Sequence, residues 1–452
     1  MTNKLTAALL LAISTLCIPA QTPAQTPAQS QSLTGRWRIS ANYFETPVFF
    51  PLKLDQQGNK LTGVFQGDKL EGTFSGNALH FIAKDSDGNT KEVTGTVHNG
   101  VLDATEVDVQ FTDKSHPLNL HITGSIAPQM KHSSSQRHEF TPTVFYRAVS
   151  ALNKPVLTIS PGDTIHTTTV DAAGNDFQGI KRSLGGNPQT GPFYIAGAMP
   201  GDTLVVHIVR LKLNRDYAIS DDVIVERGLN SALAVQAKDL GKNIRWHLDT
   251  AAGTATPDPA SAHLAHYTVP LKPMLGCIST APGISQAAPN TGDSGYYGGN
   301  MDFNEVTEGS TVYLQVSNPG ALLYFGDAHA AQGDGELNGD ALETSMDVEL
   351  TVDVIPDKHI GGRRIETPTA IVAMGLEGSL DAAFKEATAD MARWLAEDYG
   401  LTPSEVAQVI GTAAEYHVSE VADRNVGIVL KIGKDRLRTL TPSPVTPAAG
   451  TL

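Results

Sequence analysis

The first third of this chain alternates polar and apolar side chains in short runs, and this pattern limits the fold more strongly than any other feature of the sequence. The alternation is clear in residues 60–65, and Gly-Asn or Asn-Gly pairs at 58–59, 76–77 and 99–100 mark turns between such runs. Runs joined by turns of this kind are typical of antiparallel hairpins. We therefore expect a small antiparallel β-barrel or β-sandwich over residues 33–128. It contains no cluster of catalytic residue types, which favours an accessory role.

The chain continues to favour strands up to about residue 356. A polar stretch, "QMKHSSSQRHEF" at residues 129–140, indicates a linker, and Pro-Gly-Asp turns at Pro161 and Pro200 each lead into a β-rich run. The 42 glycines and 26 prolines of the chain also favour many turns over a helical bundle. We expect a second domain over residues 137–440.

Two segments near the C-terminus have helical spacing instead. Apolar residues recur every three or four positions in residues 380–395, with Ser379 placed as an N-cap and Gly400 as a stop. A second helix is expected to begin after Thr402, which forms a capping box with Glu405 and is followed by Pro403 in the first turn. A final strand is expected at residues 426–432. The predicted fold class is α+β, mainly β, with a sandwich or barrel core and C-terminal helices.

Both ends of the chain are predicted to lie outside the folded domains. Residues 1–20 have the features of a signal peptide, with Lys4, an apolar run over 7–18 and a cleavage region of small residues. The Pro/Gln/Ser-rich residues 21–32 are expected to be a disordered linker, and residues 441–452 a flexible tail. The mature protein is therefore expected in the periplasm or outside the cell.

The net charge of -15 restricts the possible partners. Nucleic acids and anionic lipid surfaces need stripes of Lys and Arg, so neither is an expected partner. No segment of the mature chain reaches about 20 consecutive apolar residues, so no membrane insertion is expected. A small or neutral substrate suits this chain better.

Residues 325–344, "FGDAHAAQGDGELNGDALET", gather one histidine with several carboxylates and glycines. Asp327 and His329 are two positions apart, so on a strand their side chains point to the same face. Catalytic zinc takes histidine nitrogen and carboxylate oxygen and leaves one position for water, which then becomes a nucleophile near neutral pH. A tight hairpin with one solvated histidine has the same spacing, and spacing alone does not separate the two interpretations.

This stretch does not fit an EF-hand calcium loop. Counting from Asp334, the early positions suit such a loop, with Gly339 at the sixth position. The twelfth position needs a bidentate glutamate and holds Ser345 instead. The flanking segments also have strand character, so the EF-hand interpretation fails.

Two other features imitate nucleophiles. The sequence "GDSG" at residues 292–295 resembles the nucleophile region of trypsin-like proteases, but the next glycine of that motif and the upstream His-Cys pair are missing. Cys277 becomes the single cysteine once Cys17 is removed with the signal peptide, so no internal disulfide is expected. A turn and a buried small thiol are the preferred interpretations.

Residues 296–350 resemble the core signature of the acetamidase/formamidase family. The matching parts are G-G-N-x-D at 298–302, G-D-x-H-A-x-Q-G-D-G-E at 326–336 and E-T-x-M at 343–346, and the resemblance extends over about residues 155–432. It implies a β-rich amidase fold that hydrolyses small carboxamides such as formamide or acetamide to ammonia and a carboxylate. It also implies a homo-oligomer and a divalent metal, with zinc expected first and calcium as the alternative.

The matching motifs supply the candidate site residues. From ligand chemistry we expect Asp302, His329 and Glu336 to face the metal or to activate water. Asp327 and Gln332 are expected to orient them. The predicted catalytic residues are Glu336, Asp327, Gln332 and Asn300, and the predicted metal ligands are His329, Asp302, Glu336 and Asp334.

The sequence also departs from the family pattern. Asn187 stands where many relatives carry a histidine before proline. In the loop at residues 273–283, Ser279 stands in place of a glycine of the family pattern. The exported N-terminal β-domain is not part of the standard family. These departures keep a second hypothesis open, in which the chain is a non-catalytic or altered-specificity binding protein that retains the amidase fold.

Overall fold

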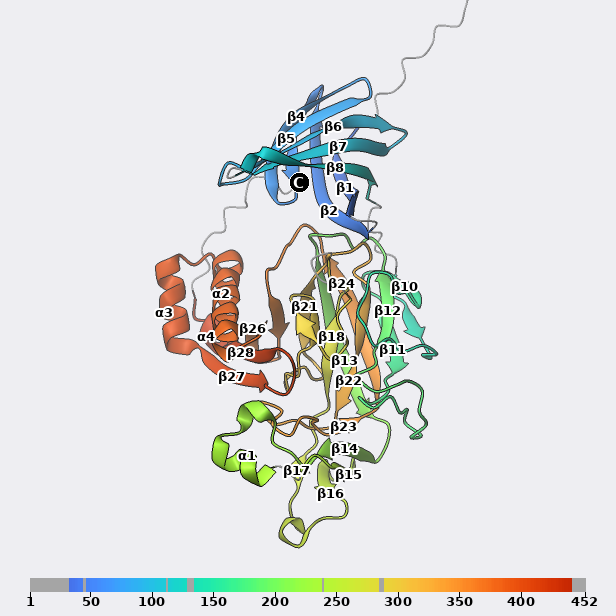
Figure 1. Ribbon diagram of the computed structural model, residues 1–452, viewed down its shortest axis with the longest axis vertical. Helices are drawn as coiled ribbons and strands as arrows, with labels where there is room; N and C mark the ends of the chain where they lie inside the picture. Colours follow the sequence, from blue (N-terminus) through green and yellow to red (C-terminus); the bar gives the residue numbers. More distant parts are fainter. Residues whose placement is uncertain are drawn as a thin grey trace, which may run out of the picture. The chain divides into compact units, whose positions relative to one another are not determined.

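The computed structural model describes residues 32–43, 46–110, 113–127, 134–237, 240–283 and 288–440, without the side chains of residues 109–110 and 113–116. The predicted signal peptide, the linker up to residue 31 and the C-terminal tail lie outside the described residues. Strands dominate the described part, and its two longest helices lie near the C-terminal end, with two more strands after them (Figure 1). This confirms the predicted α+β, mainly β class. None of the described helices is long and apolar enough to cross a membrane.

Eight consecutive strands near the N-terminus form a closed antiparallel barrel, drawn in blue to teal in Figure 1. They are β1 (Gly35–Tyr43), β2 (Thr46–Gln57), β3 (Lys60–Phe65), β4 (Asp68–Ser75), β5 (Ala78–Lys84), β6 (Thr90–His98), β7 (Val101–Gln110) and β8 (Asp113–Ile126). Each strand pairs with the next, and β8 closes the barrel on β1, where Trp37 lies opposite Ile126. Of the two predicted alternatives, the structure has the barrel.

Alternate side chains point into the barrel and form its hydrophobic core. Trp37, Phe65 and Phe81 are all buried, and the indole of Trp37 donates a hydrogen bond to the carbonyl oxygen of Leu33 at 2.9 Å. The rings of Phe65 and Phe81 make an edge-to-face contact with their centroids 5.5 Å apart. Glu106 of β7 also points inward, and it accepts a hydrogen bond from Gln66 at 3.2 Å.

The other described strands form two sheets. In spatial order the 11-stranded sheet contains β17 (Val269–Pro270), β16 (Thr254–Pro257), β15 (Asn243–Asp249), β14 (Tyr217–Asp221), β23 (Glu343–Thr344), β22 (Leu323–His329), β18 (Met274–Ser279), β20 (Gly298–Asn300) and β19 (Ser294–Gly295), and beside β22 also β12 (Thr190–Ile195) and β10 (Leu157–Ile159). The nine-stranded sheet contains β27 (Glu415–Glu420), β28 (Val426–Gly433), β26 (Ala370–Glu377), β25 (Arg363–Glu366), β21 (Thr311–Gln315), β13 (Thr203–Leu213), β24 (Met346–Ile355), β11 (Thr164–Thr168) and β9 (Arg137–Glu139).

Side chains of both sheets share one hydrophobic core. In the 11-stranded sheet, Phe193 of β12 stacks on Phe325 of β22 with the ring centroids 5.6 Å apart. In the nine-stranded sheet, Val206 of β13 and Leu350 of β24 are fully buried in the same core. Two sheets over one core make a β-sandwich, which is one of the two alternatives, sandwich or barrel, expected for the second domain.

The two predicted C-terminal helices are present, with both predicted ends of the first and the predicted start of the second. Helix α2 (Leu380–Tyr399) begins where the Ser379 side chain accepts a hydrogen bond from the amide of Ala382, and it ends at Gly400, which has a left-handed backbone. Helix α3 (Pro403–Ala413) begins with the capping box expected at Thr402. The other helices are short: η1 (Glu226–Gly228), α1 (Ser231–Ala237), η2 (Ala262–Leu264) and α4 (Lys434–Leu437).

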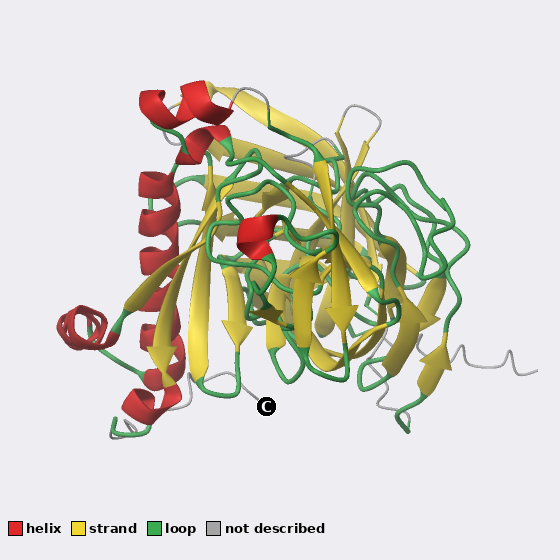
Figure 2. Cartoon of the chain, turned by 90° about the horizontal axis from the view of Figure 1, so that it is seen from below, coloured by secondary structure: helices red, strands yellow, loops and turns green. Residues whose placement is uncertain are grey.

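Helix α2 packs against the nine-stranded sheet. Figure 2 shows it running beside the strands, and its buried residues Ala383, Met391 and Leu395 join a cluster with Ile371 of β26. Gly375 of β26 makes this approach possible, because a Cβ atom there would lie only 1.9 Å from the carbonyl oxygen of Ala383.

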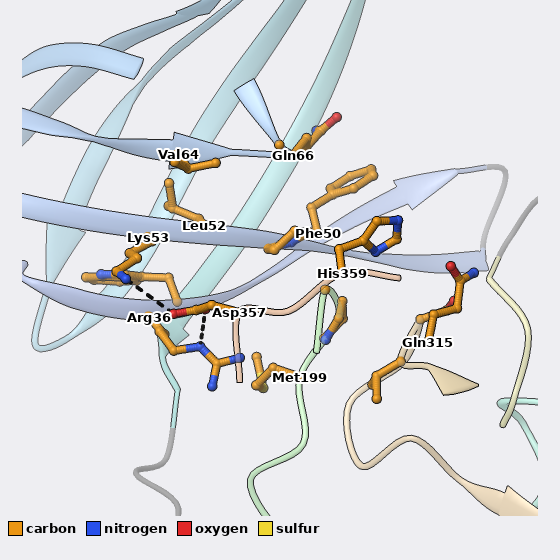
Figure 3. A pocket seen from close by; sticks show the side chains of 17 residues that line it. Arg36, Phe50, Leu52, Lys53, Val64, Gln66, Met199, Gln315, Asp357 and His359 are labelled. Carbon is orange, nitrogen blue, oxygen red and sulfur yellow. Dashed lines mark hydrogen bonds and ion pairs between the residues drawn. The ribbon is translucent and has the colours of Figure 1, made fainter. Parts of the chain in front are cut away.

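Charged side chains of the barrel also contact the sandwich domain (Figure 3). Arg36 of β1 forms an ion pair with Asp202 and a second one at 3.0 Å with Asp357, which also pairs with Lys53 at 3.3 Å. Asp202 is fully buried and accepts backbone hydrogen bonds from Met199 and Asp357 at 2.9 and 3.0 Å. Because a buried carboxylate without partners is costly, Arg36 stabilises the turn that carries Asp202.

A pocket of about 530 Å³ lies beside these ion pairs (Figure 3). Barrel residues Phe50 and Leu52 line it together with Met199, Gln315 and His359. None of the site residues predicted from the sequence lines this pocket.

Replacing Glu106 with Gln should remove a pH dependence of stability from the barrel. Burial, helped by the charge of Asp108, raises the pKa of Glu106 from its ordinary 4.5 to about 7. The folded state therefore holds this proton more tightly than the unfolded chain, so the contribution of Glu106 to stability is complete below about pH 4.5 and is lost as the pH rises to about 7. Calorimetry should show the Tm of the wild type falling relative to that of Glu106→Gln over this interval. Glu71→Gln, at an exposed site on β4, is the control, and equal pH slopes for both variants would contradict the assignment.

Replacing Arg36 with Gln should destabilise the protein, because the buried carboxylate of Asp202 loses its cation. We expect the free energy of unfolding to fall by about 1–3 kcal/mol, the usual cost of a buried polar group left without its partner. Denaturant unfolding checks this, with Arg38→Gln on the same strand as the matched control. A loss no larger than that of the control would show that the Arg36 ion pair contributes nothing.

Candidate active site

Strand β18 lies between the two strands that carry the sequence motifs. Cys277 of β18 is opposite Asn300 of β20 on one side and Gly326 of β22 on the other. This pairing places Asp302, which follows β20, close to His329 at the end of β22. The two motifs are therefore neighbours in space although residues 303–325, which include strand β21, separate them in the chain.

Carboxylates from several segments meet around one imidazole here, and we call this group the acidic cluster. It consists of Asp302, Asp327, His329, Glu336, Glu343 and Asp423. Three overlapping sets in it have ligand atoms that lie within 4.8 Å of one another: Asp302, Asp327 and His329; His329, Glu336 and Glu343; Asp302, Glu336 and Asp423. All of these residues are buried except Asp423, which is partly exposed.

His329 points one ring nitrogen into the cluster and the other at Gln332. Its Nε2 lies 2.9 Å from Oε1 of Glu343 and 3.6 Å from Oδ1 of Asp327. Its Nδ1 lies 2.9 Å from the side-chain oxygen of Gln332, whose amide nitrogen donates to the backbone oxygen of Asp302 at 2.6 Å. Since the amide nitrogen of Gln332 is the donor in that bond, the atom that faces His329 is the amide oxygen, which can only accept. Nδ1 of His329 therefore carries a hydrogen. Nε2 is then left to face the carboxylates or a cation.

Several buried atoms of the cluster have no hydrogen-bond partner among the described residues. They are Oδ1 of Asp302, Oδ1 of Asp327 and Oε2 of Glu343. Nε2 of His329 also makes no hydrogen bond within the described part of the chain, because its 2.9 Å contact with Oε1 of Glu343 lacks hydrogen-bond geometry. A buried polar atom without a partner costs about 1–3 kcal/mol, and a charged one costs more. Carboxylate oxygen and imidazole nitrogen are also the donors that zinc takes. The donor set therefore fits a divalent cation.

Burial and mutual repulsion change the pKa values of the cluster. Burial raises the pKa of Asp302 and of Glu336 well above the usual range, and in Asp302 the charges of Glu336 and Asp327 add to the effect. Burial also raises the pKa of Glu343, to about 8, although His329 opposes the shift. For His329, burial lowers the pKa, but the charges of Glu343 and Asp327 together outweigh it and the pKa is raised. Shared protons or a bound cation are the two ways to offset this concentration of negative charge.

The backbone is also unusual at the cluster. Asn187, Asp302, Asp327 and Glu336 have φ angles of 51°, 40°, 57° and 48°. Non-glycine residues rarely adopt this left-handed region, and those that do are concentrated at functional sites. The strained residues coincide with the cluster and its immediate contacts.

The structure brings most of the predicted site residues together. Asp302, Asp327, His329 and Glu336 belong to the cluster itself. Asn300 donates hydrogen bonds to Asp302 and Asp423, and Gln332 contacts His329, so these two residues surround it.

Asp334 is the exception, because the structure does not place it among the candidate ligands. Its side chain is 53% exposed and accepts a hydrogen bond from Asn304 at 2.8 Å, and it lies 3.1 Å from Nδ1 of His417. Gly335 and Glu336 both have positive φ angles, and this turn directs Glu336 inward and leaves Asp334 at the surface.

Two residues discussed from the sequence also reach the cluster. The amide of Asn187 donates hydrogen bonds to Oδ1 of Asn300 at 2.9 Å and to Oδ2 of Asp327 at 3.0 Å. Cys277 is buried, as expected, and its Sγ lies 2.7 Å from Oδ1 of Asn300. Burial, reinforced by the charges of Asp327 and Asp302, raises the pKa of the Cys277 thiol, which disfavours a thiolate nucleophile.

Sequence reasoning missed three carboxylates. Glu343 stands in the E-T-x-M motif, which was a usable signal, but no role was assigned to it. Glu420 is the last residue of strand β27 and Asp423 follows it. Both reach the site because the amide of Val421 bonds to the carbonyl oxygen of Gly335 at 3.0 Å. Burial raises the pKa of Glu420 to about 8 and that of Asp423 to about 6. No local pattern in the sequence predicts this long-range contact.

Comparison with known proteins agrees with the fold and the motifs. Residues 284–429 match the model of the Acetamidase/Formamidase family. The chain is 31% identical over 149 residues to a formamidase of Methylophilus methylotrophus, which is 28% of this chain and 36% of that protein. It is 42% identical over 59 residues to an acetamidase of Mycolicibacterium smegmatis, which is 13% of this chain and 14% of that protein. The matched segments thus span well under two thirds of these curated relatives.

The structural similarity is more extensive. The crystal structure of an acetamidase from Yersinia enterocolitica is similar over 69% of this chain and 96% of that chain, with a TM-score of 0.59 and 28% sequence identity. The family match, the relatives and the shared fold agree with one another. The sandwich domain of this chain is therefore similar in fold and in sequence motifs to proteins of the acetamidase/formamidase family.

Proposed function

We propose that this chain is an exported amidohydrolase that cleaves small linear carboxamides to ammonia and a carboxylate, assisted by a divalent cation in the acidic cluster. The observation that carries the proposal is the convergence of unpartnered buried atoms from Asp302, Asp327 and His329. The acetamidase and formamidase names of the relatives support the reaction class. Export rests on the sequence of residues 1–20, and a homo-oligomer rests on the family resemblance.

The cluster residues indicate which cation would bind. Asp302, Asp327 and His329 would hold it, because one ligand atom of each lies within 4.8 Å of the others. When bound, a divalent cation polarises an amide carbonyl and lowers the pKa of a bound water. The imidazole favours zinc, since calcium prefers oxygen ligands alone.

We assign the proton transfer to Glu336. Its Oε1 accepts a hydrogen bond from the amide of Ala341 at 3.2 Å, and the carboxylate also belongs to the cluster. In the hydrolysis, the water oxygen bonds to the carbonyl carbon, the C–N bond breaks, and a proton from the water passes to the leaving nitrogen. With a cation offsetting the negative charge that raises its pKa, Glu336 would be ionised and could accept that proton and deliver it to the nitrogen.

One observation favours the second hypothesis, a binding protein that retains the fold without this chemistry. Asn187 donates a hydrogen bond to Oδ2 of Asp327 and so occupies one carboxylate oxygen of a candidate metal ligand. It does not occupy Oδ1 of Asp327, which has no partner among the described residues. The cluster therefore keeps the donors that the enzyme needs, and the enzyme is the better supported of the two.

Metal analysis and ammonia release test the proposal together. We expect about one zinc per chain in purified protein and ammonia release from a series that begins with formamide and acetamide. Because loss of even an outer partner of a metal site costs about 10–100-fold, His329→Ala should lower kcat/KM at least about 100-fold and reduce the bound zinc. His417→Ala is the matched control, since His417 lies outside the cluster and contacts the exposed Asp334.

The possible outcomes separate the parts of the proposal. No zinc together with no ammonia from any amide would refute the amidohydrolase. An active enzyme in which His329→Ala behaves like His417→Ala would refute the assignment of the site alone.

A second variant tests the space around the cluster. A Cβ atom on Gly276 of β18 would lie 2.3 Å from Oδ1 of Asp302 and 2.8 Å from Oδ2 of Asp327. Gly276→Ala should displace both carboxylates and weaken zinc binding by about tenfold or more, measured by competition with a chromogenic chelator. Gly292→Ala is the control, because a Cβ there meets no atom within 4 Å. Equal zinc affinities in the two variants would contradict the role of Asp302 and Asp327.

A further inference from the structure

The carboxamide of Asn300 accepts two hydrogen bonds and donates two. It is buried, and its Oδ1 accepts hydrogen bonds from Asn187 at 2.9 Å and from the thiol of Cys277 at 2.7 Å. Its Nδ2 donates to one carboxylate oxygen each of Asp302 and Asp423. Donors thus lie on the oxygen side and acceptors on the nitrogen side.

This arrangement permits one orientation of the amide. A rotation of 180° would place Oδ1 of Asn300 against two carboxylates and its NH₂ group against two hydrogen donors. The thiol of Cys277 is one of those two donors, and the strand register fixes its position because Cys277 and Asn300 are opposite each other on β18 and β20. Cys277 therefore reaches Asp302 and Asp423 through Asn300, and its Sγ also lies 3.5 Å from Oδ2 of Asp327.

The orientation of Asn300 matters for Asp302. Nδ2 of Asn300 engages Oδ2 of Asp302, and Oδ1 of Asp302 is left without a partner, 3.9 Å from Nε2 of His329. If the amide could rotate, Asp302 would lose the donor that holds its second oxygen. The oxygen that faces His329 would then no longer be fixed in the cluster.

We propose that Cys277 is a positioning residue of the amidase site, whose thiol holds the Asn300 amide with its NH₂ group toward Asp302 and Asp423. This inference rests on the proposed function, because it assigns Cys277 to the machinery of the same reaction. It differs from the interpretation of Cys277 as a small apolar core residue, which depends only on side-chain volume. Hydrogen donation and volume can be varied separately at this position.

Three variants separate the two interpretations. Cys277→Ser keeps a donor, Cys277→Val removes the donor and retains an apolar side chain, and Cys277→Ala removes both donor and volume. We expect Cys277→Val and Cys277→Ala to lower kcat about 10–100-fold with little change in KM, the range found for residues that orient a metal site. Cys277→Ser should restore most of kcat. Normal turnover in Cys277→Val, or a loss in Cys277→Ser as large as in Cys277→Val, would overturn the proposal.

A measurement without substrate tests the same contact. Asn187→Ala removes the other donor to Oδ1 of Asn300, so the Tm shifts of Cys277→Val and Asn187→Ala should not add in the double variant. Thr402→Ala, which removes the distant cap of helix α3, is the control, and its Tm shift should add to that of Cys277→Val. Additive shifts for the first pair would overturn the link through Asn300.

The zinc affinity of the variants distinguishes a failure of this inference from a failure of the proposed function. We expect Cys277→Val to bind zinc about tenfold more weakly than Cys277→Ser, because Asp302 loses its fixed orientation. If the wild type releases no ammonia but the Tm shifts and zinc affinities behave as expected, the proposed reaction fails and the positioning role stands. If the wild type is active but the Tm shifts and zinc affinities do not behave as expected, the positioning role fails and the proposed reaction stands.

Discussion

The repulsion between carboxylates that are buried together around His329 is the constraint on which this site depends. The carboxylates of the acidic cluster are removed from water at one place, and a single imidazole cannot neutralise them. Such a group persists only where protons, hydrogen donors or a cation offset the charge. The protein supplies some of these donors itself, since Asn300 donates to Asp302 and Asp423. The atoms that still lack a partner define where a cation fits and where the chemistry of amide hydrolysis would take place.

A rigid scaffold is needed to keep like charges so close. The cluster lies at the ends and edges of strands that belong to the sandwich, and Phe325 of β22 stacks on Phe193 in the hydrophobic core. Close approach is obtained by omitting side chains, because Gly276 leaves the space that Asp302 and Asp327 occupy. The left-handed backbone at several cluster residues is maintained by the same packing. Site geometry and core packing are therefore parts of one arrangement.

The barrel has a separate role in this structure. Among the described contacts of the acidic cluster, none comes from a barrel residue. The barrel has its own hydrophobic core, and it contacts the sandwich domain through ion pairs such as that of Arg36 with the buried Asp202. The acidic cluster thus belongs to the sandwich domain, and the barrel is an additional module joined to this domain by charged contacts.

Local structure could be predicted because its causes are close together in the sequence. Alternation and turn pairs indicated the barrel strands, and the capping residues at Ser379 and Thr402 indicated both helices. The spacing of Asp327 and His329 likewise predicted two side chains on one face of a strand.

The sequence by itself determined these elements and most members of the site, since spacing along a strand or helix sets which side chains share a face. The tertiary structure alone decided which atoms meet. It brought Asp423 to the cluster through a contact between segments far apart in the chain, and it turned Asp334 out to the solvent at the same loop that directs Glu336 inward. It also placed the thiol of Cys277 against Asn300. Such contacts depend on how separate loops and strands pack, and no local pattern in the sequence records that packing.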